Sequence, residues 1–281
     1  MVTSTMTPVE EFHALHEKGC FVIPNPWDIG SARILHHLGF KALATTSAGY
    51  AFSQGLPDAI EALEMDKVLA HTSEIVSATS LPVNADFQNG YADEPEAVGK
   101  NVMLCVKTGA AGISIEDATG DEKNPLYERE LAIERIKAAR SAIDAGAVKP
   151  VLTARCEAYL VGAPNAFKVT LDRLVAYADA GADCLFAPMV SDPKEIEAIV
   201  KSVVPKPVNV IISNSTTGLT VQKLADLGVR RISVGSALAR MAYGAFMHSA
   251  KTIIEKGTFD SFGVAASFAE LNEIFAVNCD K

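Results

Sequence analysis

The sequence predicts an α/β protein of the (β/α)8 TIM-barrel class, with residues 1–281 forming one domain. Two observations support this prediction. Short apolar runs rich in β-branched residues recur along the chain, and each is followed by a loop and then by a segment with helical periodicity. We count eight such units in the sequence. Eight βα units in a chain of about 250 residues fit a closed barrel better than an open sheet, which usually has fewer strands.

The expected strands are recognised by their β-branched composition and by the loops that bound them. In chain order they are CFVIPN (20–25), KALATT (41–46), LPVNAD (81–86), GISIED (112–117), PVLTAR (150–155), DCLFAP (183–188), PVNVII (207–212) and RRISVG (230–235). Amphipathic segments lie between them, among them 94–109, 127–146 and 169–183. Several of these segments contain a Gly near the end, where a helix C-cap is expected.

A helical extension is expected after the last strand, in residues 236–281. A long helix through 241–257 and a further helix within 262–277 carry more apolar residues than one outer barrel helix needs to bury. Packing against a second subunit would bury them, so we expect a homo-oligomer, either a dimer or a tetramer. The alternative is that the extension covers the bottom of the barrel.

Composition and charge narrow the range of partners. The chain has 49% hydrophobic and 21% charged residues, as globular proteins do. A net charge of −9 argues against nucleic-acid or anionic-membrane surfaces, which require clustered Lys and Arg. No stretch approaches a membrane span or a signal peptide, and the five cysteines include no CxxC pair. We therefore expect a cytoplasmic protein whose partner is a small molecule.

Polar residues follow the expected strands at the end where a barrel carries its active site. Asn84 and Asp86 lie two residues apart on one strand, hence on the same face, and Glu116 ends the next strand. This oxygen-rich set suits Mg²⁺, which needs only one or two protein carboxylates. No histidine falls at a strand end, which disfavours a zinc site or a His general base. The alternative is that Asp86 and Glu116 form ion pairs with Arg155.

Three further positions are candidates for substrate binding. Arg155 ends an apolar strand, where a bidentate clamp on a carboxylate or phosphate would explain a guanidinium. Ser47 is expected to hydrogen-bond a substrate carboxylate, or else to cap a local turn. Trp27 is expected to shape the far side of the pocket, or else to fill the barrel mouth.

An ordered set of motifs resembles the isocitrate lyase and phosphoenolpyruvate mutase superfamily over nearly the whole chain. The motifs are TTSAG (45–49), GLPD (55–58), VNAD (83–86), IED (115–117), TARCEAYLVG (153–162) and AYADAGAD (176–183). The resemblance implies a Mg²⁺-dependent barrel, with Mn²⁺ as the alternative ion, that is commonly a tetramer with an exchanged terminal helix. It also implies cleavage or formation of a C–C or C–P bond beside a carboxylate, through a pyruvate-type enolate.

The resemblance assigns a metal shell. Asp86 and Glu116 match two acidic residues of that shell, and Asp58 matches another acidic residue near the metal. Asn84 stands where the family has the first Asp of its DAD strand. A carboxamide can still accept a hydrogen bond from a metal-bound water but adds no charge, so weaker metal binding is expected.

The resemblance also assigns the substrate site. Ser47 and Ala48 match the pair that holds the substrate carboxylate, and Arg155 matches the family's substrate-binding Arg. Gly49, which follows that pair, completes the expected substrate-binding set together with Trp27.

Two departures from the family restrict the reaction. The catalytic KKCGH loop of the isocitrate and methylisocitrate lyases is replaced by EDATGDEKNPLYERE (116–130), where Lys123 and Asn124 are candidates for the gating-loop roles of other branches; the alternative is an ordinary mobile loop. The mutase histidine after the sixth strand is also missing, because Ala187 and Pro188 occupy that region.

We therefore expect a Mg²⁺-dependent lyase that cleaves a C–C bond of a small 2-oxo or 2-hydroxy acid, as in oxaloacetate-like decarboxylation. The alternatives are a C–P hydrolase or phosphonomutase acting on a phosphonopyruvate-like substrate, and a degenerate barrel that only binds a 2-oxo acid.

Overall fold

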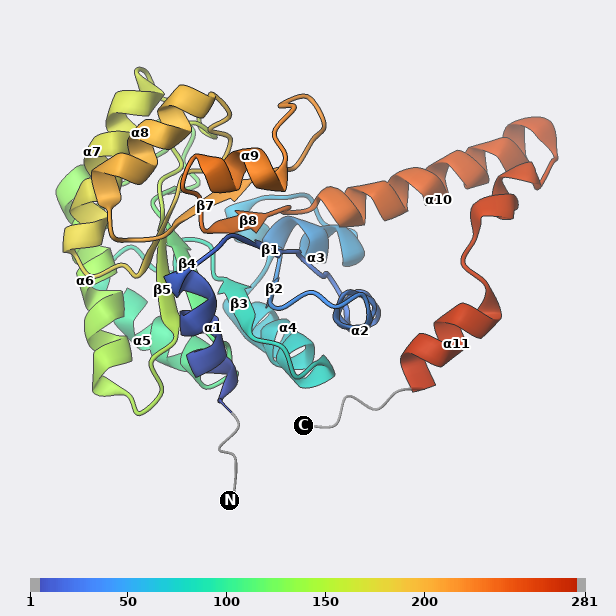
Figure 1. The fold of residues 1–281 in the computed structure, drawn as a ribbon, viewed down its shortest axis with the longest axis horizontal. Coiled ribbons are helices and arrows are strands. Elements are labelled where there is room, and N and C mark those ends of the chain that lie inside the picture. Colours follow the sequence, from blue (N-terminus) through green and yellow to red (C-terminus); the bar gives the residue numbers. More distant parts are fainter. Residues whose placement is uncertain (1–5, 277–281) are drawn as a thin grey trace.

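The computed structural model describes residues 6–276 and confirms the (β/α)8 barrel (Figure 1). Eight parallel strands form one sheet in the order β1-β8-β7-β6-β5-β4-β3-β2. They are β1 (Phe21–Ile23), β2 (Leu43–Ala44), β3 (Val83–Asp86), β4 (Gly112–Glu116), β5 (Val151–Arg155), β6 (Cys184–Phe186), β7 (Val208–Ile211) and β8 (Arg231–Ser233). The backbone N–H of Ala44 donates to the carbonyl of Pro24 at 3.0 Å, which joins the two edge strands and closes the barrel.

Helices alternate with the strands and form the outer layer (Figure 1). They are α1 (Pro8–Glu17), α2 (Ile29–His37), α3 (Ser47–Ser53), α4 (Met65–Ala78), α5 (Pro95–Val106), α6 (Arg129–Ala145), α7 (Ala166–Asp179), α8 (Pro193–Val203) and α9 (Val221–Asp226). The short 3-10 helix η1 (Ile60–Ala62) follows α3. The observed strands are shorter than the apolar runs because residues at one or both ends of each run lie in the loops that flank the strand.

Helix α3 begins directly after β2 because its first turn is capped locally. The Thr46 hydroxyl accepts a hydrogen bond from the backbone N–H of Gly49 at 3.1 Å. A side chain at Gly49 has no room, since an added Cβ would lie 2.6 Å from Cγ2 of Thr46 and 3.2 Å from Cβ of Trp27. This packing holds Ser47 and Ala48 at the mouth of the barrel.

The lower half of the barrel interior contains a buried polar group. Arg231 is 3% exposed, and its guanidinium donates to Asn209 Oδ1 at 2.9 Å and to Thr153 Oγ1 at 3.0 Å. Its third partner is Nε2 of His16, on α1, at 3.3 Å. Helix α1 thus seals the bottom of the barrel with both Phe12 and His16.

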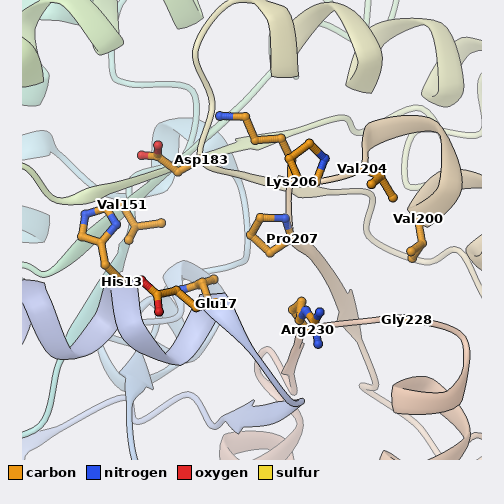
Figure 2. Close-up of a pocket in the computed structure, with 12 residues that line it drawn as sticks. His13, Glu17, Val151, Asp183, Val200, Val204, Lys206, Pro207, Gly228 and Arg230 are labelled. Carbon is orange, nitrogen blue, oxygen red and sulfur yellow. The ribbon is translucent and has the colours of Figure 1, made fainter.

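A cavity of about 480 Å³ lies at this bottom end, beside α1 (Figure 2). Its walls come from α1 and from residues at the N-terminal ends of the strands, such as Val151, Pro207 and Arg230. The cavity is therefore on the opposite side of the barrel from the expected active site.

The expected C-terminal helices are present. Helix α10 (Ala237–Lys256) projects away from the barrel, and the 3-10 helix η2 (Asp260–Val264) and α11 (Phe268–Ala276) follow it (Figure 1). Helix α11 returns to α2, where Phe275 approaches Gly30. Large apolar side chains on this arm are exposed, among them Phe246, Ile254, Val264 and Phe268. Within residues 6–276, no helix has the length and apolar character that crossing a bilayer requires.

Candidate active site

A cavity of about 870 Å³ opens at the C-terminal ends of the strands. It brings together residues that are far apart in the sequence: Asp58 from the loop after α3, Asp86 from β3, Glu116 from β4 and Arg155 from β5. Ser47 and Ala48, at the start of α3, line the same cavity. The active-site position expected for a barrel is therefore the position at which these candidates meet.

Arg155 occupies the centre of the carboxylate cluster. Its Nη1 atom lies 3.1 Å from Oε2 of Glu116 and 3.5 Å from Oδ1 of Asp86. Its Nε and Nη2 atoms also donate to both carboxylate oxygens of Glu157, which is completely buried. The ion pairing that the sequence left open as an alternative is therefore formed, and Glu157 adds a further carboxylate to the cluster.

Burial and mutual repulsion perturb the ionisation of these groups. Burial raises the pKa of Glu116 to about 8; the Arg155 charge opposes that shift, while the carboxylates of Glu157 and Asp86 add to it. The pKa of Asp58 is also raised, by partial desolvation and then by the Asp86 charge. Burial alone would lower the pKa of Arg155, but the neighbouring carboxylates outweigh it and raise the value. The cluster thus has more negative charge than Arg155 alone balances.

Asp86 is held by backbone and side-chain contacts at the barrel rim. Its Oδ2 atom accepts a hydrogen bond from the backbone N–H of Ser47 at 2.9 Å, and its own N–H donates to Thr45 Oγ1 at 2.9 Å. The Ser47 N–H was expected to face a substrate carboxylate, and here it orients Asp86 instead.

Gln88 is a site residue that the sequence analysis missed. It lies just after β3 with a left-handed backbone (φ 43°), lines the cavity beside Asp86 and is 4% exposed. Its Oε1 atom is buried without a hydrogen-bond partner, which is costly unless a ligand or water supplies a positive or donating group. The two-residue spacing from Asp86 is no guide to Gln88, because β3 ends at Asp86 and strand alternation does not extend beyond it.

Asn84 lies deeper in the barrel and does not line this cavity. A Cβ added at Gly112 would lie 2.6 Å from Oδ1 of Asn84 and 2.5 Å from Cε1 of Phe12, so the carboxamide oxygen points toward the sealed bottom. A smaller interior cavity of about 60 Å³ contacts both Asn84 and Asp86. Asn84 is therefore separated from the group formed by Asp58, Glu116 and Gln88.

The donor set fits a hard cation that keeps most of its water. Within residues 6–276, no three Asp, Glu, His or Cys side chains come close enough to share one ion directly. However, the described walls of the large cavity carry six carboxylates and two guanidinium groups, and neither Cys nor His. Mg²⁺ takes one or two direct carboxylates and several waters. Asp86, Glu116, Asp58 and the unpartnered Gln88 oxygen suit that requirement.

Four other expected site residues do not line the cavity: Trp27, Gly49, Lys123 and Asn124. Gly49 and Trp27 instead pack against each other behind α3. In the loop after β4, Asn124 Nδ2 donates to Asp121 Oδ2 at 3.1 Å. Asp121 and Glu122 of this loop line the cavity, whereas Lys123 and Asn124 do not.

Comparison with known proteins identifies the family of the chain. The phosphoenolpyruvate phosphomutase family model matches residues 12–254. A crystal structure of a protein described as a lyase/mutase from Burkholderia cenocepacia J2315 is 47% identical, with a TM-score of 0.92 over 96% of this chain and 95% of that one.

Two curated relatives extend the comparison. An uncharacterized protein of Mycobacterium tuberculosis is 32% identical over 86% of this chain and 88% of its own. The 2-methylisocitrate lyase of Escherichia coli is 27% identical over 87% and 82%. The chain therefore belongs to the phosphoenolpyruvate phosphomutase family, within the isocitrate lyase/PEP mutase superfamily.

Proposed function

We propose that the protein is a cytoplasmic, Mg²⁺-dependent lyase that cleaves a C–C bond of a small 2-oxo or 2-hydroxy acid through a pyruvate-type enolate. The observation that carries the proposal is the meeting of Asp58, Asp86, Glu116 and Arg155 around one cavity whose described walls contain neither Cys nor His. When a 2-oxo acid loses CO₂ from the carbon beside its keto group, the electrons of the broken C–C bond pass to the carbonyl oxygen, so the step requires charge stabilisation rather than a protein nucleophile.

Each residue has a role that follows from its position. Asp86, Glu116, Asp58 and Gln88 would hold the metal and its water, with Asp86 nearest to it. Bound Mg²⁺ would supply the positive charge that stabilises the enolate oxygen. Arg155, released from part of its contact with Glu116, binds the substrate carboxylate, and Ser47 and Ala48 flank that carboxylate. Glu157 keeps the guanidinium of Arg155 in place through contacts to two of its nitrogens.

Oxalate, a mimic of the pyruvate enolate, tests the proposal without a known substrate. We expect oxalate to raise the thermal stability of the protein only when Mg²⁺ is present. A ligand at 100 times its Kd adds about 2.7 kcal/mol, which is an easily measured shift. If oxalate and Mg²⁺ together leave the melting temperature unchanged, the proposal is wrong and the protein is no enolate-forming enzyme.

A C–P hydrolase or phosphonomutase is the second candidate, favoured by the description of the matching family model. Release of inorganic phosphate from phosphonopyruvate identifies the hydrolase, and its conversion to phosphoenolpyruvate identifies the mutase, because C–C cleavage of a 2-oxo acid gives neither product. Neither Cys nor His lines the described cavity, which favours the C–C lyase, since the proposed cleavage requires neither.

We also propose a homo-oligomer, a dimer or tetramer built through the C-terminal arm. The arm exposes Phe246 at 70%, Ile254 at 84% and Phe268 at 90%, far more apolar surface than an outer barrel helix presents. Sedimentation velocity at micromolar concentration tests this, and a single monomeric species would contradict it.

A further inference from the structure

The chemistry of the active-site cavity changes around its walls: an acidic sector and an apolar sector lie side by side, and Ser213, Asn214 and Arg240 add a polar sector after β7 and β8. Acidic residues come from β3, β4 and the first residues after β5. The next sector of the mouth, formed by the loops after β5 and β6 and by the end of β7, is apolar. Its side chains are Leu160, Val161, Pro188, Met189 and Ile211. Because β5, β6 and β7 are neighbours in the sheet, these side chains form one continuous side of the mouth.

Two of these apolar side chains are exposed. Leu160 is 53% exposed and Met189 is 45% exposed, and both face a cavity rather than a neighbouring helix. Met189 also has a left-handed backbone with φ 70°, a conformation that is unfavourable for a side chain of this kind. Strain of this sort is retained where the surrounding structure needs the residue in place, commonly at ligand sites.

The cavity is also larger than a compact diacid needs. At about 870 Å³ it is within the range of sites that enclose much larger ligands. A ligand that ended at the carboxylate cluster would leave Leu160, Val161 and Met189 in water. An alkyl group on the ligand would instead remove that apolar surface from water, which is favourable.

From these features we infer that the substrate is a 2-oxo or 2-hydroxy acid that carries an alkyl group beyond the reacting carbon, seated on the sector formed by Leu160, Val161 and Met189. This inference rests on the proposed function, because it places the acid end of the molecule at Arg155 and Asp86. A far-end carboxylate, as in oxaloacetate, would instead lie on the polar sector that contains Arg240.

A chain-length series of ligands tests the inference. Kd values for pyruvate, 2-oxobutanoate, 2-oxopentanoate and 2-oxohexanoate are measured by calorimetry in the presence of Mg²⁺, with oxalate as the reference that has no alkyl chain. We expect binding to tighten about fourfold with each added methylene, which corresponds to the ~0.8 kcal/mol of a buried CH₂ group. The gradient should be reduced in Leu160→Ser, while oxalate binding stays unchanged.

The matched control is Leu38→Ser. Leu38 is also an exposed leucine, at 65%, but it lies at the end of α2 and not in the cavity, so its replacement should preserve the gradient. If oxalate binds with Mg²⁺ while affinity is flat or falls with chain length, the inference is wrong and the proposed function stands. A gradient that is the same in wild type and Leu160→Ser also overturns it. If oxalate fails to bind, the proposed function itself fails.

Discussion

The backbone N–H of Ser47 donates a hydrogen bond of 2.9 Å to the carboxylate of Asp86. The residue proposed to hold the metal and the residue proposed to flank the substrate carboxylate are therefore linked directly. Ser47 begins α3 and Asp86 ends β3, so the contact also links the first turn of a helix to the neighbouring strand. A change at Asp86 should consequently affect both halves of the site.

Replacing Asp86 by Ala should abolish turnover and the stabilisation by oxalate with Mg²⁺, removing the whole of the expected ~2.7 kcal/mol at 100 times Kd. Asp86→Asn should lose the same Mg²⁺ effect, because the negative charge is gone, while keeping an oxygen that accepts from Ser47. Thermal melts of both variants, with and without oxalate and Mg²⁺, provide the measurement. Activity within a few-fold of wild type in Asp86→Ala would contradict the metal role.

Gln88→Glu should bind Mg²⁺ about tenfold more tightly than wild type. The substitution places a carboxylate at the buried oxygen that now has no partner, and a nearby opposite charge contributes on the order of 1 kcal/mol or more. Titration calorimetry with Mg²⁺ alone measures the effect.

Asn84→Asp is the matched comparison for Gln88→Glu, because both replace a carboxamide by a carboxylate. Both residues are 4% exposed and both have a buried oxygen without a hydrogen-bond partner, but only Gln88 lines the large cavity. A charge at Asn84 should therefore destabilise the protein by about 3 kcal/mol in urea unfolding and should not strengthen Mg²⁺ binding. Tighter Mg²⁺ binding in Asn84→Asp alone would contradict the role proposed for Gln88. It would indicate that the metal lies beside residue 84, as the family resemblance implies.

Asp117→Ala should cost about 3–5 kcal/mol of stability, because it breaks a buried ion pair. Oδ2 of Asp117 accepts from Tyr177 Oη at 2.6 Å and from Arg173 Nη1 at 2.9 Å, and its Oδ1 accepts from the N–H of Glu157 at 2.8 Å. Tyr177→Phe removes one neutral donor and should cost only about 1 kcal/mol.

A surface pair supplies the control for Asp117. Asp172→Ala breaks the exposed contact with Arg129 and should cost less than about 1 kcal/mol in the same denaturant titration. Equal losses for Asp117→Ala and Asp172→Ala would show that the buried network contributes nothing special to folding.

The wild-type protein should lose stability in acid partly through His16. Burial, and then the Arg231 charge, lower the pKa of His16 from 6.5 to about 3. The unfolded chain therefore binds this proton at a higher pH than the folded chain does. The contribution of His16 to the free energy of unfolding is fully present above pH 6.5 and is lost as the pH falls toward 3. About 2 kcal/mol of it should be lost between pH 8 and pH 5.

His16→Gln should remove that component, so its free energy of unfolding should depend less steeply on pH than that of wild type. The exposed His37→Gln is the control and should keep the wild-type slope. Urea titrations at pH 5, 6.5 and 8 measure the slopes. Parallel curves for His16→Gln and wild type would contradict the assignment.

The sequence predicted the barrel well because its signals are local. Each of the eight apolar runs contains an observed strand, and the expected long helix after β8 is α10. The residues at which each strand begins and ends were less predictable, because strand pairing depends on neighbours that are distant in sequence. Residues 41–46 form only the two-residue strand β2, since Thr46 already caps α3.

The candidate site was predicted in part. Asp86, Glu116 and Arg155 line one cavity because the ends of parallel strands share one rim, and Asp58 reaches the same cavity from the loop after α3. Strand alternation correctly places Asn84 and Asp86 on one face, but two residues along a strand correspond to a separation of about 6.6 Å in depth. Gln88 could not be placed by alternation, because β3 has ended and the backbone at that residue is left-handed.

The hydrogen bond between Ala44 and Pro24 marks the weakest junction between neighbouring strands of the barrel. Seven of the eight strand junctions are ladders of paired residues, whereas β1 and β2 are joined at their ends by a single backbone bond. The barrel should therefore open most easily between β1 and β2. This junction is next to Thr45 and Ser47, whose hydrogen bonds orient Asp86. Thermal opening of the barrel should therefore affect Asp86, the proposed metal ligand, first, while the strands on the far side remain paired.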